Sequence, residues 1–112
     1  MSDLADRSCT PCQAGAEPLD DHSVTELLEQ LDPGWDVVNA HHLARVYRFP
    51  DFRQALAFVN AVGGMAEDQG HHPDLHLAWG RVGVEVWTHK IDGLHEADFV
   101  FAARCDRLYP QS

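Results

Sequence analysis

The chain is poor in cysteine, in basic residues and in long apolar runs. Its three cysteines are a small, odd set that does not fit the disulfide framework of a secreted small domain, so reduced thiols are the simplest interpretation. Eight Lys and Arg residues stand against 18 Asp and Glu residues, for a formal charge of -10. Because these basic residues are also scattered, direct binding of nucleic acid is disfavoured.

The missing apolar runs exclude a membrane role. No run approaches the roughly 20 residues that a membrane helix needs, so no membrane partner is expected. The start, residues 1–7, is acidic and has neither the basic flank nor the apolar stretch of a secretory signal. The sequence therefore predicts a cytoplasmic location.

The length of 112 residues allows one compact domain with a single core. Residues 1–18 contain small polar residues, two prolines and no apolar periodicity, so they are predicted to be a flexible N-terminal tail before a domain at 19–112. Cys9 and Cys12 have the spacing of half a zinc site or of a redox pair. A second pair of thiols is missing, so a passive tail is favoured.

Apolar periodicity predicts the elements of this domain. Steps of three and four residues indicate helices, and alternation indicates strands. The predicted elements are a helix over 21–31, strands over 35–39 and 42–49 around a turn near 40–41, a helix from 51 to about 69, a hairpin with apolar Leu75, Leu77 and Trp79 followed by Val82, Val84 and Val86, and a helix from 94 or 95 to 108.

This order, α-β-β-α-β-β-α, favours an α+β fold in which three helices pack on one face of a four-stranded antiparallel sheet. The long second helix is expected to bury a stripe along one side, and burial of Phe52 alone would contribute about 1.5 to 3 kcal/mol. The stripe consists of Phe52, Ala55, Leu56, Val59, Val62, Gly63 and Ala66.

Histidines and acids gather where these elements begin or end. Gly70 can take the left-handed conformation that ends a helix, which would deliver His71, His72 and Pro73 to the loop just beyond. His89 follows the second hairpin, and Asp98 falls in the first turns of the last helix. Histidine, with an unperturbed pKa of about 6.5, can donate and accept a proton near neutrality. The set therefore suits acid and base catalysis.

Over roughly Leu19 to Tyr109 the chain resembles the pterin-4a-carbinolamine dehydratases. The residues that carry the resemblance are Glu67, His71-His72-Pro73, Thr88-His89, Gly93-Leu94 and Asp98, with looser agreement at Gly34-Trp35 and at Phe49 to Phe58. The resemblance implies removal of water from 4a-hydroxytetrahydrobiopterin, the product of aromatic amino acid hydroxylases, to give the quinonoid dihydropterin in tetrahydrobiopterin recycling. It implies neither a metal nor an organic cofactor.

The resemblance also implies roles for single residues. It assigns His71 and His89 to proton transfer and His72 to holding the pterin, with Glu67 and Asp98 as supporting acids. A carboxylate on the far nitrogen of an imidazole would fix its tautomer and raise its basicity, although the sequence leaves open which acid serves which histidine.

Two further residues are candidates on chemical grounds. Pro73 would stiffen the loop that carries His71 and His72. Trp35 would stack on the flat pterin ring, and a place in the core is the alternative for it.

The remaining histidines have no role in the resemblance. Surface positions are the default for His22, His41, His42, His76 and His95. His72 and His76 alone are too few ligands for a metal site. A homodimer or homotetramer is expected, because exposed strand edges tend to be paired and members of the family are dimers and tetramers. The rival to the enzyme is a non-catalytic module for protein binding, assembly or dimerisation on the same fold.

Overall fold

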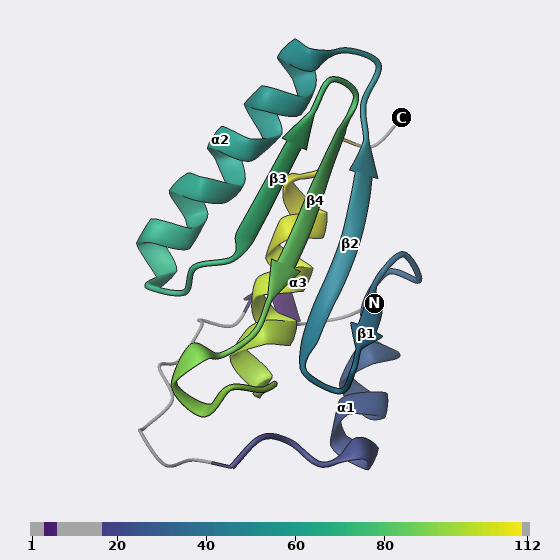
Figure 1. Cartoon of the computed structure of the whole chain (residues 1–112), viewed down its shortest axis with the longest axis vertical. Coiled ribbons are helices and arrows are strands. Elements are labelled where there is room, and N and C mark those ends of the chain that lie inside the picture. The colour runs from purple at the N-terminus through teal and green to yellow at the C-terminus, as the bar shows by residue number, and fades with distance from the viewer. Residues whose placement is uncertain (1–3, 7–16, 111–112) are drawn as a thin grey trace.

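The computed structural model describes residues 4–6 and 17–110, and its elements follow the predicted order (Figure 1). The helices are α1 (Asp21–Leu28), α2 (Phe52–Gln69) and α3 (Glu96–Leu108), and the strands are β1 (Asp36–Val38), β2 (His42–Arg48), β3 (Asp74–Ala78) and β4 (Arg81–Val86). Two short 3-10 helices, η1 (Leu4–Asp6) and η2 (His89–Ile91), complete the set. The α+β prediction is confirmed.

The four strands form one antiparallel sheet in the order β1-β2-β4-β3. Alternate residues of the central strands turn inward, so that Leu43 and Tyr47 on β2 pair with Val86 and Val82 on β4 and are buried with them. Figure 1 shows α3 passing behind the sheet, with α2 beside β3 and α1 below β1. The helices therefore cover one face and leave the other face open.

Helix α3 is the most deeply buried helix, with every residue from 97 to 103 and Cys105 buried. The sheet and the other helices contact one part of it, and η1 contacts another. Leu4 and Ala5 of η1 are buried in the same core. These residues lie within the segment that the sequence predicts to be a flexible tail, so at least this short piece packs on the domain. Residues 1–3 and 7–16 of that segment, with Cys9 and Cys12, lie outside the described residues.

Helix α2 corrects one prediction. It begins after the N-cap Asp51 and buries Ala55, Phe58, Val62 and Ala66, whereas Phe52 is 44% exposed and Leu56 is 39% exposed. Each residue turns the helix by about 100°, so both side chains lie to the side of the buried stripe. The expected contribution from burial of Phe52 is therefore wrong.

Two element ends also differ from the prediction. The first helix ends at Leu28 rather than near Leu31, because the chain tightens so that the N–H groups of Gln30 and Leu31 bond to carbonyls three residues back. This tightening brings Leu31 into the core. Strand β3 ends at Ala78, so Trp79 lies in the turn and is 69% exposed instead of continuing the buried alternation.

Candidate active site

The predicted histidines meet where α2, β4, η2 and α3 come together. Gly70 ends α2 in the left-handed conformation, with a φ of 64°, as the sequence predicts. Its turn lets the His71 N–H donate to the Ala66 carbonyl at 3.2 Å. The His71 ring therefore points back toward the start of α3 instead of continuing outward into solvent.

Asp98 is held in place at the centre of this region, because its carboxylate is fully buried and accepts three hydrogen bonds. His71 Nε2 lies 2.6 Å from Oδ1. The Thr88 hydroxyl and the His95 N–H both donate to Oδ2 at 2.8 Å. The last contact belongs to the capping box of α3, which ties the carboxylate to the helix start. Asp98 is therefore the acid that serves His71.

A hollow of about 170 Å³ opens beside this pair and contains the other two histidines. Its lining residues are Gly70, His71, His72, Trp87, Thr88, His89 and Lys90. His71 is largely buried, with 13% of its side chain exposed, whereas His72 and His89 are exposed. The hollow thus combines one buried imidazole on a carboxylate with two imidazoles that face solvent.

The loop that carries His89 is closed by backbone contacts. Thr88 and Gly93 form an isolated bridge in which each N–H bonds to the other carbonyl, at 2.9 and 3.4 Å. Gly93 also packs closely on Pro18, because an added Cβ would come within 2.9 Å of the Pro18 side chain and would force it to shift. The Gly93 of the sequence pattern therefore holds the short turn that presents His89.

The remaining predicted acid, Glu67, and Pro73 lie beside His72 rather than beside Asp98. Glu67 is exposed on the last turn of α2, and one of its carboxylate oxygens lies 3.5 Å from His72 Nε2. Pro73 follows His72 directly and leads into β3. Both therefore accompany His72, at the rim rather than in the buried pair.

Trp35 is not brought to the histidines. It is buried in the core, and its indole N–H donates to both carboxylate oxygens of Asp106 at 3.0 Å. Asp106 also accepts from Tyr47 and from Arg45, at 2.5 and 2.7 Å. Burial raises the pKa of the Asp106 carboxyl, although the hydrogen bonds from Tyr47 and Trp35 and the charge of Arg45 oppose this. Within this chain Trp35 thus has the core position weighed as the alternative.

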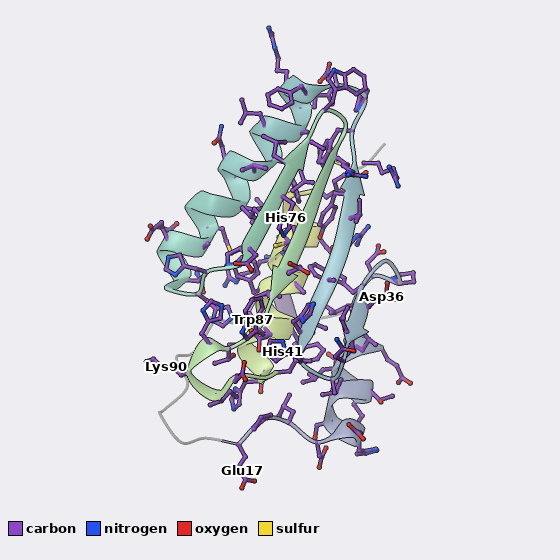
Figure 2. All side chains as sticks on the ribbon, viewed as in Figure 1. Glu17, Asp36, His41, His76, Trp87 and Lys90 are labelled. Carbon is purple, nitrogen blue, oxygen red and sulfur yellow. The ribbon has the colours of Figure 1, made fainter. Side chains whose placement is uncertain are left out.

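Trp87 is a site residue that the sequence reasoning missed. Its ring lies against the His89 ring, with centroids 4.5 Å apart and planes tilted by 36°, and it lines the hollow. Its ring also contacts those of His41 and His42, with centroids 5.1 and 5.7 Å away. Figure 2 shows Trp87 near His41. The available signal was its position directly before the Thr88-His89 pair, at the end of an alternating strand.

His41 and His42 are half-buried rather than surface residues. His41 Nε2 lies 2.7 Å from Asp92, and the two Nδ1 atoms of the pair lie 3.1 Å apart. The alternation of strand residues could not have revealed this pair, because it depends on the turn at Asn39 and Ala40, where both residues have a φ of 54°.

Within the described ranges, 4–6 and 17–110, no group of three or more His, Cys, Asp or Glu side chains is arranged to hold a metal ion. No helix in those ranges is both long and apolar enough to cross a membrane.

A small α+β fold with a histidine and carboxylate hollow at the sheet's end is the class that these observations define. The family model described as pterin 4 alpha carbinolamine dehydratase matches residues 17–108. The chain belongs to this family. A Rubrobacter xylanophilus protein provisionally named pterin-4-alpha-carbinolamine dehydratase is 56% identical over 108 residues, which cover 96% of this chain and 100% of that protein. An Alkaliphilus metalliredigens protein with the same provisional name is 47% identical over 96% of each chain.

Two solved structures are similar to this chain. A Brucella melitensis protein described as a transcriptional coactivator/pterin dehydratase is 30% identical, with a TM-score of 0.79 over 84% of this chain and 100% of that one. A pterin dehydratase-like protein, identified as a RuBisCO assembly factor in the alpha-carboxysome, is 26% identical, with a TM-score of 0.61 over 70% of this chain and 93% of that one. The fold is thus shared by proteins described by an activity and by a protein described by an assembly role.

Proposed function

We propose that this protein dehydrates a 4a-hydroxytetrahydropterin, with 4a-hydroxytetrahydrobiopterin as the expected substrate, to the quinonoid dihydropterin and water. One observation carries the proposal above all others. His71 is bonded to the buried carboxylate of Asp98 in the same hollow that His72 and His89 line. A scaffold has no need for a buried, oriented imidazole beside two exposed ones.

The hydrogen bond to Asp98 decides which nitrogen of His71 is reactive. An ionised carboxylate only accepts, so Nε2 carries the proton and Nδ1 holds the free lone pair of the neutral ring. A carboxylate on the far nitrogen also raises the basicity of an imidazole. His71 therefore acts as the base that removes the N5 proton of the pterin.

His89 acts as the acid that protonates the leaving hydroxyl. Its ring is exposed, so it can hold a proton from solvent and pass it to the leaving hydroxyl. The bond from C4a to oxygen breaks, the hydroxyl leaves as water with the proton of His89, and the N5 proton goes to His71. The double bond between C4a and N5 forms in the same elimination. His72, with Glu67 at 3.5 Å, contacts the pterin at the rim, and Pro73 limits the freedom of that loop.

The test is the rate of dehydration of freshly prepared 4a-hydroxytetrahydropterin. We expect His71→Ala and His89→Ala each to lose about 10² to 10⁴-fold in rate, the usual contribution of one positioned acid or base. His22→Ala is the matched control, because His22 is an exposed histidine on α1 that pairs with Glu26. Folded wild-type protein that gives no acceleration, or variants that keep full activity, would remove the proposal.

The expected homo-oligomer remains a proposal with two structural supports. Strands β1 and β3 are the sheet edges and can pair with another chain, and Phe52, Leu56 and Leu108 expose apolar surface on the helices. Sedimentation at micromolar concentration should detect a dimer or tetramer, and a monomer alone would contradict this.

Three further expectations stay predictions. They are supply of the substrate by an aromatic amino acid hydroxylase, a role in tetrahydrobiopterin recycling, and a cytoplasmic location. The rival function, non-catalytic protein binding, can coexist with catalysis. The assembly factor with the same fold supports keeping it.

A further inference from the structure

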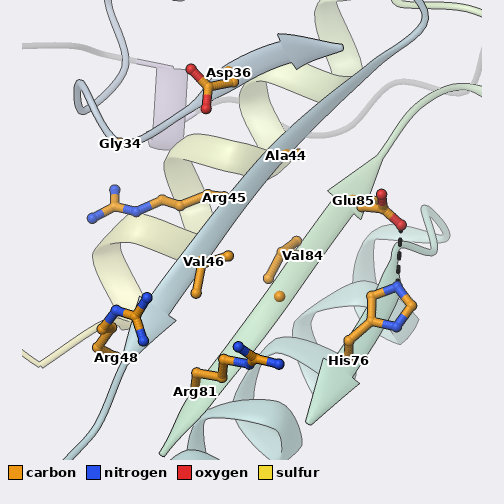
Figure 3. A pocket seen from close by; sticks show the side chains of 11 residues that line it. Gly34, Asp36, Ala44, Arg45, Val46, Arg48, His76, Arg81, Val84 and Glu85 are labelled. Atoms are coloured by element: carbon orange, nitrogen blue, oxygen red, sulfur yellow. Dashed lines mark hydrogen bonds and ion pairs between the residues drawn. The ribbon is translucent and has the colours of Figure 1, made fainter. Parts of the chain in front are cut away.

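The open face of the sheet has a second hollow, with lining residues of its own. A depression of about 520 Å³ crosses β2, β4 and β3 on the side away from the helices (Figure 3). Outward-facing residues line it, among them Val46 and Arg48 of β2, Arg81 and Gly83 of β4, and His76 of β3. It shares no lining residue with the histidine hollow.

Two arginines form the most unusual feature of this face. Arg48 and Arg81 are direct cross-strand partners on β2 and β4, and both are exposed. Like charges placed opposite each other destabilise a sheet. Within residues 4–6 and 17–110 neither guanidinium has a carboxylate partner, whereas Arg45 on the same strand is paired with both Asp32 and Asp106. In a chain with 18 acidic residues and a charge of -10, this unpaired arginine pair calls for an external anion.

The floor beside the arginines is low and apolar. Val46 is 53% exposed and pairs with Gly83 in the middle of β4. Packing does not require a glycine there, because a Cβ would meet its nearest neighbour, His76 Cβ, at an ordinary 3.6 Å. A glycine inside a strand weakens it and often marks close approach by a ligand or another backbone. Gly83 thus allows another molecule to approach the strand closely, although glycine is unfavourable within a strand.

The opposite end of the depression is acidic. Glu85 pairs with His76 at 3.1 Å and lies 3.5 Å from His42, and Asp36 lines the same end. Figure 3 places Arg48 and Arg81 toward one end and Asp36 and Glu85 toward the other. A bound molecule with one negatively charged end would therefore bind in a single orientation, with that charge beside the arginines.

We propose that this face docks an extended segment of a partner protein. The segment places an Asp or Glu side chain between Arg48 and Arg81, and an apolar side chain on Val46 and Gly83. The depression crosses three strands and Val46 on its floor is 53% exposed, so an extended segment can lie along it.

The spacing on the sheet defines the spacing on the partner. Arg48 and Val46 are two residues apart on β2, or roughly 6.8 Å at about 3.4 Å per residue. Side chains at positions i and i+2 of an extended segment have the same separation and point the same way. The partner is therefore expected to present an apolar residue and an acidic residue with one residue between them.

The proposal can be tested by titrating isotopically labelled full-length protein with a peptide and following amide shifts by NMR. The probe is Gly-Thr-Val-Thr-Glu-Thr-Gly, blocked at both ends, and its control has Lys in place of Glu. We expect the acidic peptide to shift amides of β2, β4 and β3, and the Lys peptide to shift none. High salt should weaken the binding, because exposed ion pairs are screened.

Three variants make the test specific. Arg48→Gln with Arg81→Gln should raise the Kd about 25-fold, or about fivefold for each exposed ion pair. Gly83→Val should abolish binding while raising strand propensity, so loss of binding there does not mean loss of folding. Arg53→Gln, an exposed arginine on α2, is the matched control and should bind as wild type does.

Several results would overturn the proposal. They are no amide shifts with the acidic peptide, equal binding of the Lys peptide, or an unchanged Kd in the double arginine variant. Sedimentation in which wild type self-associates and Gly83→Val does not would assign the face to a second copy of this chain instead. Dehydration of the pterin should be equal in wild type and the double variant, which keeps this test separate from that of the proposed function.

Discussion

Helix α3 carries two carboxylates that each accept hydrogen bonds from three residues, one carboxylate in its first turn and one in its last. Asp98 accepts from His71, Thr88 and the His95 N–H. Asp106 accepts from Trp35, Tyr47 and Arg45 instead. The geometry is similar, but one partner set includes a histidine and the other an arginine. Histidine gains and loses a proton near neutral pH, whereas arginine stays charged.

This difference in partners suits Asp98 to the proposed reaction and Asp106 to a structural role. Asp98 is the more deeply buried of the two, yet its histidine lines a hollow that is open to solvent. Asp106 keeps 20% of its side chain exposed, but its donors are an indole, a phenol and a guanidinium that have no proton to exchange near neutrality. Under the proposed function, the carboxylate with a catalytic role is therefore the one whose partner can titrate and reach solvent, and burial alone does not identify it.

The largest stability effect should come from the Asp106 end. Asp106→Ala removes the acceptor for Trp35 and Tyr47 and leaves Arg45 with Asp32 alone, at 3.1 Å. We expect a loss of about 2 to 4 kcal/mol in the free energy of unfolding, measured by urea denaturation. The folded fraction should keep wild-type dehydration rates per molecule. A variant as stable as wild type would show that this network does not anchor α3.

Asp98→Asn should show the opposite pattern. The Asn amide oxygen can replace the oxygen that accepts from Thr88 and His95, but its NH₂ group then faces His71 Nε2 and forces the other tautomer. Nδ1 of His71 becomes protonated and can no longer act as the base. We expect kcat to fall about 10 to 100-fold, as when the partner of a functional histidine is lost, with a smaller change in KM. An unchanged kcat in the folded variant would contradict the role of this pair.

The two ends of α3 also differ in how far sequence alone could predict them. Asp98, His71 and His89 belong to an ordered motif, so their convergence was expected, although only the structure assigns Asp98 rather than Glu67 to His71. Nothing in the sequence marks Asp106, because its partners lie on the loop before β1 and on β2.

The alternation of strands and helices was sufficient for the fold, since it depends on local periodicity. It failed where position depends on how an element sits on its neighbours. Phe52 and Trp79 are apolar and in register with buried residues, yet one lies beside the buried stripe of α2 and the other beyond the end of β3. Trp87 was missed for the same reason, because its contact with His89 depends on the η2 turn.

The second catalytic candidate, His89, is held by a different kind of partner. The ring of Trp87 packs against His89, whereas His71 is bonded to a carboxylate. Trp87→Leu should lower kcat/KM about 2 to 10-fold, the range expected for loss of one aromatic pair. Trp87→Phe should retain most of the activity, because it keeps a flat ring. Steady-state rates of both variants make the test, and equal losses in the two would mean that stacking on His89 is not what Trp87 provides.

The smallest effect on stability should come from Asp20, a carboxylate that is exposed to solvent. Asp20 is the exposed N-cap of α1, and its hydrogen bond from the Ser23 N–H holds its pKa below the usual 3.8. A lowered pKa means that the charged form stabilises the fold above pH 3.8, and that this contribution is lost as the pH falls through the lower folded value. Asp20→Asn keeps a capping oxygen without the charge. The difference in Tm between wild type and Asp20→Asn should therefore be small at pH 6 and should shrink as the pH falls below 3.8 and Asp20 becomes protonated. A difference that grows as the pH falls would show that the charge of Asp20 opposes folding, and would remove it as the exposed reference for Asp98 and Asp106.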